Sequence, residues 1–304
     1  MLNYANCKAQ CAKQGYETAY AHENSFEMTN HSSHKGQTIL DEILAQENAT
    51  QYHNNIQSEI INTLDWTKVG DTTEAPFRYI CQISIFANGT QYFGSGVLVG
   101  PKTVLTAAHN IWNDVTNALC NLKTDNIIVT PGKKNNSAPF GTSKAVKLIT
   151  ATGYNNAQET TKLDYGIIHL DKPIGNSAGF WTMSYKKWAK DTLGTSILPG
   201  NLPQNTGQLK VNLSGYPYSP KNKVLGYTPI KSYDNTVDIK NGMLLYKNDS
   251  KGGHSGSPIW VRRHSSMGGR VLVGIHVCCR GTKIANKAVF IDKSIRDFIK
   301  ANII

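Results

Sequence analysis

The 304-residue chain lacks long apolar runs, and this shortage excludes two kinds of segment. No run approaches the roughly 18 apolar residues that a membrane-spanning helix needs, so we expect no membrane span. The first residues, MLNYANCKAQCAKQ, contain no apolar h-region, so no secretory signal peptide is visible. Charged residues are also scarce at 17%, whereas glycines number 26, which is typical of a turn-rich globular protein.

Metal-binding cysteine motifs are missing too. The six cysteines form no CxxC pair and no Cys/His cluster of zinc spacing, so we expect no metal and no other cofactor. A disulfide between Cys81 and Cys120 is compatible with an oxidising compartment, although their spacing alone does not establish it. We interpret the adjacent Cys278 and Cys279 as two ordinary thiols.

The charge of the chain is unevenly divided. The net charge is +11, but residues 1–59 carry three lysines against seven acidic residues, which gives −4 and leaves +15 on the remainder. The basic residues are scattered, and no RNA-binding aromatic motif or zinc-finger spacing accompanies them, so we expect no nucleic-acid partner. A dispersed solvated surface, or a preference for acidic substrates, explains the positive charge better.

The chain divides into an acidic leader, residues 1–59, and a β-rich body. In the leader, one helical face is formed by Ile39, Leu40, Ile43 and Leu44, so we expect it to be partly helical. The body contains two groups of about six short β-rich runs, at about 75–172 and 205–292. Strands of this spacing, without long helices between them, indicate an all-β barrel or sandwich.

The second group of runs ends in a predicted helix. The runs begin with QLKVNLSGYP and KVLGYTPIKSY, which we predict to be strands. The chain then closes on KSIRDFIKANII, where Ile295, Phe298 and Ile299 form the apolar stripe of a helix.

Three short motifs carry residues with catalytic chemistry. LTAAHNIW delivers His109 at the end of a strand, LDYGIIHL places Asp164 just before an apolar strand, and GGHSGSP surrounds Ser255 with glycines. A serine hydroxyl becomes a nucleophile when an imidazole accepts its proton, and a buried carboxylate fixes the tautomer of that imidazole. These motifs therefore predict a catalytic triad of His109, Asp164 and Ser255.

The glycines around Ser255 also predict how the site binds negative charge. They permit a tight turn that aims the amides of Gly253 and Ser255 at one point, so we expect these two N–H groups to form an oxyanion hole. The loop does not match a phosphate-binding loop, because GxxxxGK[ST] is absent. It does not match the nucleophile elbow of an α/β-hydrolase either, because the strand-like PIWVRR, rather than a long helix, follows the serine.

The motifs TAAH, DYGIIHL and GGHSGSP resemble those of chymotrypsin-fold serine proteases, and the ending VGIHVCCRGTKIANKAVFIDKSIRDFIKANI is similar to that of the V8-like glutamyl endopeptidases. The resemblance covers residues 60–304. It implies two six-stranded antiparallel β-barrels with the triad in the cleft between them, and a serine endopeptidase that acts on proteins or peptides. It also implies a secreted enzyme, and we expect a monomer.

The same resemblance implies cleavage after Glu, and also after Asp. The family positions for the primary specificity pocket correspond here to Ser250 and His276, and the α-amino group exposed by processing is the third element. Together they would bind a carboxylate side chain. The chain departs from the family at His254, where Asn or Asp is usual before the nucleophile. It also has Val277, Cys278 and Cys279 where tryptophan and glycines are common.

The family's mature start aligns near the junction of Glu59 and Ile60, so we expect this junction to be the processing site. Residues 1–59 would then be an acidic propeptide that complements the basic domain, residues 60–304, until it is removed. Two other functions remain open: a chymotrypsin-fold protease of another specificity, and a non-catalytic protease-like binding module.

Overall fold

A computed structural model describes eight stretches of the chain, and the fold is given for these alone. The stretches are residues 67–87, 90–113, 116–155, 161–182, 210–217, 230–262, 270–279 and 286–304. The predicted leader and its helix lie outside the described residues, as does the processing site at Glu59 and Ile60. Their prediction therefore stays a prediction.

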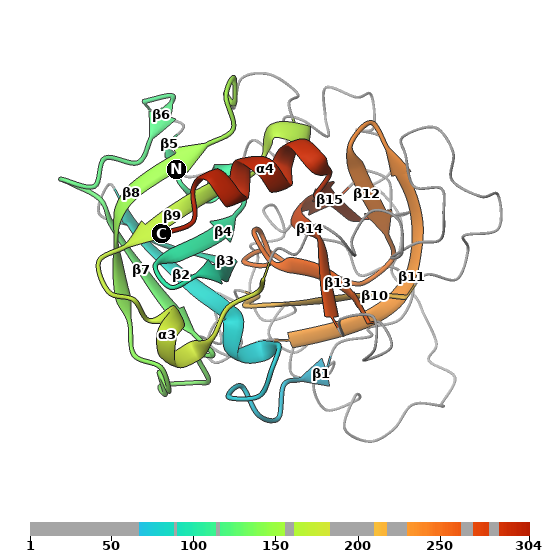
Figure 1. The fold of residues 1–304 in the computed structure, drawn as a ribbon, viewed down its shortest axis with the longest axis horizontal. Helices are drawn as coiled ribbons and strands as arrows, with labels where there is room; N and C mark the ends of the chain where they lie inside the picture. Colours follow the sequence, from blue (N-terminus) through green and yellow to red (C-terminus); the bar gives the residue numbers. More distant parts are fainter. Residues whose placement is uncertain are drawn as a thin grey trace, which may run out of the picture.

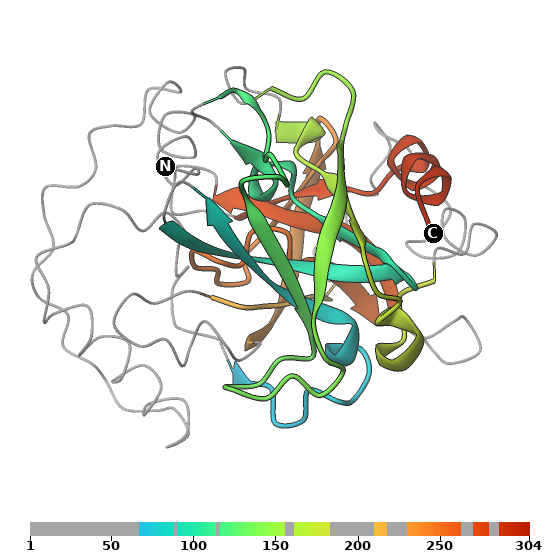
Figure 2. The same ribbon diagram turned by 90° about the vertical axis from the view of Figure 1, so that its left-hand side faces the viewer.

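The first group of strands closes into an antiparallel barrel, seen in the front of Figure 2. In their order around the barrel, the strands are β2 (Ile80–Ala87), β3 (Thr90–Gly100), β4 (Thr103–Thr106), β9 (Gly166–Leu170), β8 (Ser143–Thr150) and β7 (Asn126–Pro131). Two short strands, β5 (Trp112–Asn113) and β6 (Ala118–Leu119), form a separate hairpin. Closure leaves no free strand edge within the six-stranded barrel itself.

The cysteines of this barrel are not bonded to each other. Cys81 and Cys120 are buried in the same apolar core as thiols, so the disulfide considered from the sequence is not formed. Burial raises the pKa of the Cys81 thiol above its ordinary value, which keeps it in the neutral form that an apolar core favours.

The second group of strands forms a sheet that also curls into a ring. Its order is β1 (Thr67–Lys68), β11 (Ile230–Lys240), β10 (Lys210–Gly215), β13 (Pro258–Arg262), β14 (Arg270–Cys279), β15 (Asn286–Phe290) and β12 (Met243–Tyr246). The long strand β11 pairs with β10 through its first half and with β12 through its second half, which closes six of the strands. The predicted two-barrel, all-β fold is confirmed.

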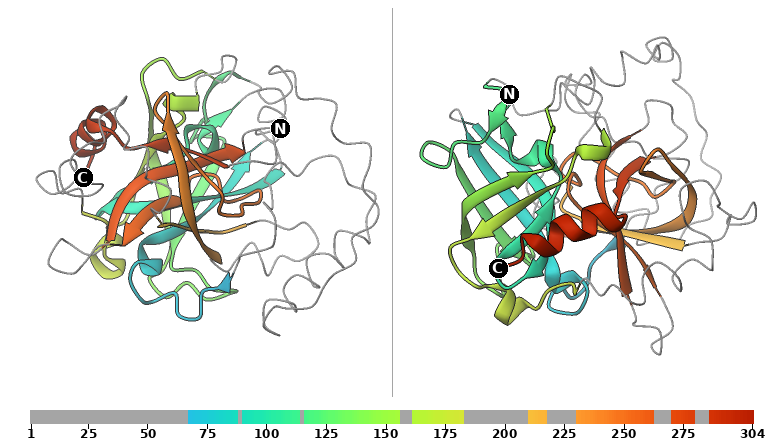
Figure 3. Two further views of the ribbon diagram at one scale, coloured as in Figure 1. Left: turned by 90° about the vertical axis from the view of Figure 1, so that its right-hand side faces the viewer. Right: turned by 45° about the horizontal axis from the view of Figure 1, so that its top comes forward.

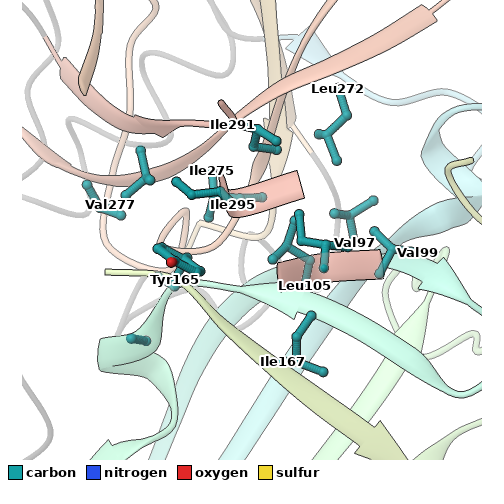
Figure 4. Close-up of a cluster of buried hydrophobic side chains, with 14 of the residues drawn as sticks. Val97, Val99, Leu105, Tyr165, Ile167, Leu272, Ile275, Val277, Ile291 and Ile295 are labelled. Carbon is teal, nitrogen blue, oxygen red and sulfur yellow. The ribbon is translucent and has the colours of Figure 1, made fainter. Parts of the chain in front are cut away.

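Apolar side chains from both barrels meet in one core, shown in Figure 4. Val97, Leu105 and Ile167 come from the first barrel, and Leu272 and Ile275 from β14 of the second. Because each of these side chains is fully or almost fully buried, the two barrels pack as one unit. This packing fixes the strand ends of one barrel against the loops of the other.

The C-terminal helix α4 (Lys293–Ala301) crosses from the second barrel to the first (Figures 1 and 3). The Asp292 side chain caps it by accepting the N–H of Ile295 at 2.9 Å. After the helix, the N–H of Ile304 donates to Thr103 Oγ1 at 2.9 Å, at the start of β4. The predicted C-terminal helix is thus confirmed, and it connects the two barrels. The remaining helical turns are η1 (Phe77–Tyr79), η2 (Ala108–Asn110), η3 (Thr161–Leu163) and α3 (Gly175–Ala178).

Candidate active site

His109 and Asp164 form a hydrogen-bonded pair in the first barrel. Asp164 Oδ2 lies 2.7 Å from His109 Nδ1, and Asp164 Oδ1 accepts the backbone N–H of His109 at 2.9 Å. Both carboxylate oxygens are therefore occupied by one residue. The His109 side chain is 16% exposed and the Asp164 side chain 12%, so little water competes for these hydrogen bonds. This arrangement holds the imidazole in one orientation, with Nε2 as its other nitrogen.

Small residues allow the two motifs to approach so closely. His109 lies in η2, directly after β4, and the preceding Ala107 and Ala108 are completely buried. A Cβ atom on Gly166 would lie 2.8 Å from Ile111 Cδ1 and 3.6 Å from Ala108 Cα. A larger residue at Gly166 would push the histidine turn away from the strand that follows Asp164.

The loop of Ser255 is held against the histidine turn through its backbone. The carbonyl of Ser255 accepts the N–H of Ser95 at 2.8 Å and the side-chain amide of Asn110 at 2.8 Å. Asn110 is the residue after His109, so this hydrogen bond links the first motif, LTAAHNIW, to the third, GGHSGSP, across the two barrels. The structure thus brings the segments of His109, Asp164 and Ser255 together.

The backbone conformation of this loop leaves two amides without a backbone acceptor. Gly253 and Gly256 have φ of 92° and 84°, a region that favours glycine. The carbonyl of His254 accepts the N–H of Ser257 at 2.8 Å, so the N–H of the same peptide group, that of Ser255, points the opposite way. Within the described residues, neither the Gly253 nor the Ser255 N–H donates a backbone hydrogen bond. Both amides are thereby left available to a substrate.

Ser250 and His276 are buried next to this loop. The N–H of Gly256 donates to the His276 carbonyl at 2.8 Å, and the N–H of His276 donates to the Ser257 carbonyl at 2.9 Å. His276 Nδ1 is hydrogen-bonded to the Tyr246 hydroxyl. Ser250 is fully buried, and its hydroxyl has no partner among the described residues. A polar group of this kind is costly unless something binds it.

Two neighbouring histidines are kept neutral by burial. Desolvation lowers the pKa of His254 from 6.5 to about 3. Desolvation, together with the charges of His254 and His109, lowers the pKa of His276 well below 6.5. The two rings lie 6.4 Å apart and almost perpendicular. The His254 Nδ1 accepts the N–H of Lys251 at 3.0 Å, which requires an unprotonated nitrogen.

These shifts predict a pH-dependent stability. Above pH 6.5 both histidines are neutral in the folded and unfolded chain, so their contribution is fully retained. Below it the unfolded chain binds protons that the folded chain rejects, so the free energy of unfolding falls as the pH drops from 6.5 towards 3, by up to about 1.4 kcal/mol per pH unit for each histidine. Urea unfolding at pH 5 to 7.5 measures the slope. His254→Asn should make the slope shallower, and an unchanged slope would contradict the assignment to His254.

Three residues of this site were not singled out from the sequence: Ser95, Asn110 and Tyr246. Ser95 makes a backbone contact with Ser255, and its signal was the pair of glycines around it in a predicted strand, a pattern typical of close backbone approach. Asn110 and Tyr246 carry no comparable local signal, since their partners are distant in sequence.

The region that carries this site, residues 68–299, matches the family model described as trypsin. The chain belongs to the trypsin family. The match includes both barrels and all three motifs, so the resemblance to chymotrypsin-fold serine proteases is confirmed.

This trypsin-family chain is similar in sequence and in fold to glutamyl endopeptidases. It is 32% identical to the glutamyl endopeptidase of Bacillus licheniformis over 68% of its length and 29% identical to a protein named extracellular metalloprotease of Bacillus subtilis over 75%. It spans 56% and 66% of those two relatives. A solved Glu endopeptidase, in complex with MPD, matches with a TM-score of 0.63 at 20% identity, covering 80% of this chain and 98% of that one. At this identity, the structural match supports the fold alone.

Among the described residues, no helix has the length and hydropathy needed to cross a membrane. No group of three or more His, Cys, Asp or Glu side chains in this part of the chain is arranged to hold a metal ion.

Proposed function

We propose that this trypsin-family chain is a serine endopeptidase that cuts after glutamate, and also after aspartate, with His109, Asp164 and Ser255 as its triad. The observation that carries the proposal is the His109–Asp164 pair, in which both carboxylate oxygens bond to the histidine. The hydrogen bond from the Asn110 side-chain amide to the Ser255 carbonyl supports the placement of the nucleophile beside this pair. The B. subtilis relative bears a metalloprotease name, but the described residues offer no cluster of metal ligands.

In this mechanism the Ser255 hydroxyl attacks the carbonyl carbon of the scissile bond while His109 Nε2 takes its proton. Asp164, which holds Nδ1, stabilises the imidazolium that forms. The amides of Gly253 and Ser255 donate to the oxyanion of the tetrahedral intermediate. His109 then returns the proton to the leaving amine, and a water molecule repeats the sequence to release the acyl group from Ser255.

The preference for glutamate would come from Ser250, His276 and the amine exposed by processing. When Tyr246 donates to Nδ1 of the neutral His276 ring, the ring proton lies on Nε2 and can donate to a carboxylate. The unpartnered, buried hydroxyl of Ser250 is a second donor. The two backbone bonds of His276 to the nucleophile loop support its place beside the scissile residue.

We therefore expect His276→Ala to weaken cleavage after Glu selectively. Loss of one partner of a buried, hydrogen-bonded charge typically costs about 2–4 kcal/mol, so kcat/KM for Glu peptides should fall about 30- to 1000-fold. Peptides with Phe or Ala at the cleaved position should change little. The matched control is His169→Ala, which removes a buried histidine of the first barrel that bonds to Asn302. Equal losses on all peptides in the His276 variant would assign that residue a structural role.

A panel of fluorogenic peptides with Glu, Asp, Lys, Phe or Ala at the cleaved position tests the function as a whole. Cleavage only after Lys or Phe would leave a chymotrypsin-fold protease of another specificity. No turnover by the processed protein would favour a non-catalytic binding module.

We also propose that residues 1–59 are an acidic propeptide and that cleavage between Glu59 and Ile60 releases the amine that completes the pocket. The charge asymmetry supports this, and so does the Glu at the junction, which the enzyme itself would recognise. N-terminal sequencing of the active preparation belongs to the same experiment, and Met1 at its start would contradict the proposal. We propose secretion as well, in keeping with the extracellular name of the B. subtilis relative.

A further inference from the structure

We propose that Ser95 is a positioning residue for the oxyanion hole: its buried hydroxyl holds the Gly253 carbonyl and so fixes the turn that presents the Gly253 and Ser255 amides. Ser95 lies in β3 of the first barrel and is completely buried. It touches none of the reacting atoms in the mechanism above. The inference rests on the proposed function, because it assigns a role in that same reaction.

The direction of the Ser95 hydroxyl is set by two partners. Its oxygen accepts the N–H of Tyr216 at 2.8 Å and lies 2.7 Å from the carbonyl oxygen of Gly253. A hydroxyl has a single proton, and a backbone N–H cannot accept it, so the proton must point to Gly253. The donor that holds Gly253 is thereby oriented before any substrate binds.

The backbone of Ser95 holds the other end of the same turn. Its N–H donates to the Ser255 carbonyl at 2.8 Å, so the carbonyls of Gly253 and Ser255 both bond to one residue. The intervening carbonyl, that of His254, bonds to Ser257 instead. Alternate carbonyls are therefore fixed on opposite sides. Because the N–H and C=O of a trans peptide point in opposite directions, this fixes the Ser255 amide as well.

Ser95 also connects this turn to the histidine motif. Its carbonyl accepts the Thr106 hydroxyl at 2.7 Å, and Thr106 lies three residues before His109. The packing is close, since a Cβ atom on Gly256 would lie 2.0 Å from the Ser95 carbonyl oxygen. A shift of Ser95 would therefore move the nucleophile loop directly.

The chain offers a matched control in Ser143, at the start of β8 in the same barrel. Ser143 is 2% exposed, and its hydroxyl also makes one donated and one accepted bond, to Asp171 Oδ1 and from the N–H of Lys172. These partners belong to the segment after β9 and include no residue of the nucleophile loop. Replacement of Ser143 by alanine therefore removes an equivalent buried hydroxyl without disturbing Gly253.

The test compares Ser95→Ala and Ser143→Ala, each expressed as the whole chain and assayed as the active preparation, with the peptide that the wild-type protein prefers. Loss of an oxyanion donor typically costs 10²- to 10³-fold in kcat, so loss of a residue that positions one should cost about 10- to 100-fold. KM should stay within about threefold, because ground-state binding is untouched. Ser143→Ala should keep kcat, and thermal unfolding measures the stability of both variants.

A pair of inhibitors reports the oxyanion hole separately. A peptide aldehyde forms a tetrahedral adduct with Ser255 whose oxyanion needs the two amides, whereas the corresponding peptide alcohol only fills the substrate site. In Ser95→Ala the preference for the aldehyde over the alcohol should fall by about the same factor as kcat. Ser95→Cys keeps a weak S–H donor and should have an intermediate kcat; it also serves if the alanine variant does not fold.

An unchanged inhibitor preference in Ser95→Ala, or an equal loss of kcat in Ser143→Ala, would overturn the role of Ser95 while the proposed function stands. A wild-type preparation that cleaves no peptide of the panel and forms no aldehyde adduct would instead overturn the proposed function.

Discussion

Replacing Ser255 by alanine is expected to lower kcat by about 10⁵- to 10⁶-fold while KM stays nearly constant. Without its hydroxyl the turn still presents the Gly253 and Ser255 amides, because both are set by the backbone and by Ser95. The substrate therefore still binds, but His109 has no proton to accept and no acyl group can be transferred. Removal of a triad nucleophile typically has an effect of this size. Single-turnover kinetics with the preferred peptide of the panel measures it.

The control for this variant is Ser257→Ala, in the same motif. Ser257 is completely buried, and its hydroxyl has no hydrogen-bond partner among the described residues. Its removal should leave kcat within about threefold and should not lower the stability, since an unpaired buried hydroxyl is itself unfavourable. A Ser255→Ala variant with more than a hundredth of the wild-type kcat would remove Ser255 from the mechanism.

The sequence predicted those parts of the site that are coded locally. TAAH places His109 just after a strand, and LDYG places Asp164 just before one. The glycines around Ser255 indicate a turn with positive φ, which favours glycine. The pairing of His109 with Asp164, 55 residues apart, followed from the chemical need of an imidazole for a carboxylate. Motif chemistry thus located the reacting groups without any knowledge of the packing.

Contacts between distant, chemically plain residues could not be predicted in this way. Ser95 and Gly253 are 158 residues apart, and Asn110 and Ser255 are 145 apart. A serine or an asparagine in a loop or strand usually meets water, and only the docking of the barrels shows which of them become buried connectors. Tyr246 was missed for the same reason, since it is one of 14 tyrosines in the chain and lies 30 residues before His276.

One strand extends beyond its predicted end for a physical reason. The strand predicted at KVLGYTPIKSY is confirmed at residues 230–233, and its first part, residues 223–229, lies outside the described residues. Strand β11 continues to Lys240 through Asp234, Asn235 and Asp238, which the sequence did not predict. Such residues disfavour strands on their own. Here β11 gains partners on both sides, β10 and β12, and a register shift between Thr236 and Asp238 lets it bend from one to the other. Tertiary pairing overrides the local preference.

The second large effect is expected for Asp164→Asn, which should lower kcat by about 10⁴-fold at neutral pH. The carboxylate accepts two hydrogen bonds from His109, one from the backbone N–H and one from Nδ1. An amide has only one oxygen. If that oxygen keeps the backbone N–H, the amide N–H₂ faces Nδ1, which must then be the unprotonated nitrogen. The ring proton moves to Nε2, the nitrogen that has to accept the proton of Ser255.

The opposite orientation of the amide is no better, because its N–H₂ would then face the backbone N–H of His109 and two donors would meet. KM should change little, since Asp164 does not reach the substrate. Asp125→Asn is the matched control: Asp125 is 6% exposed, lies in the same barrel and accepts the N–H of Asn121 at 2.9 Å. It should lose stability without loss of kcat. If Asp164→Asn retained kcat within tenfold of wild type while folded, the imidazole would not depend on this carboxylate, and the assignment of Asp164 to the triad would be wrong.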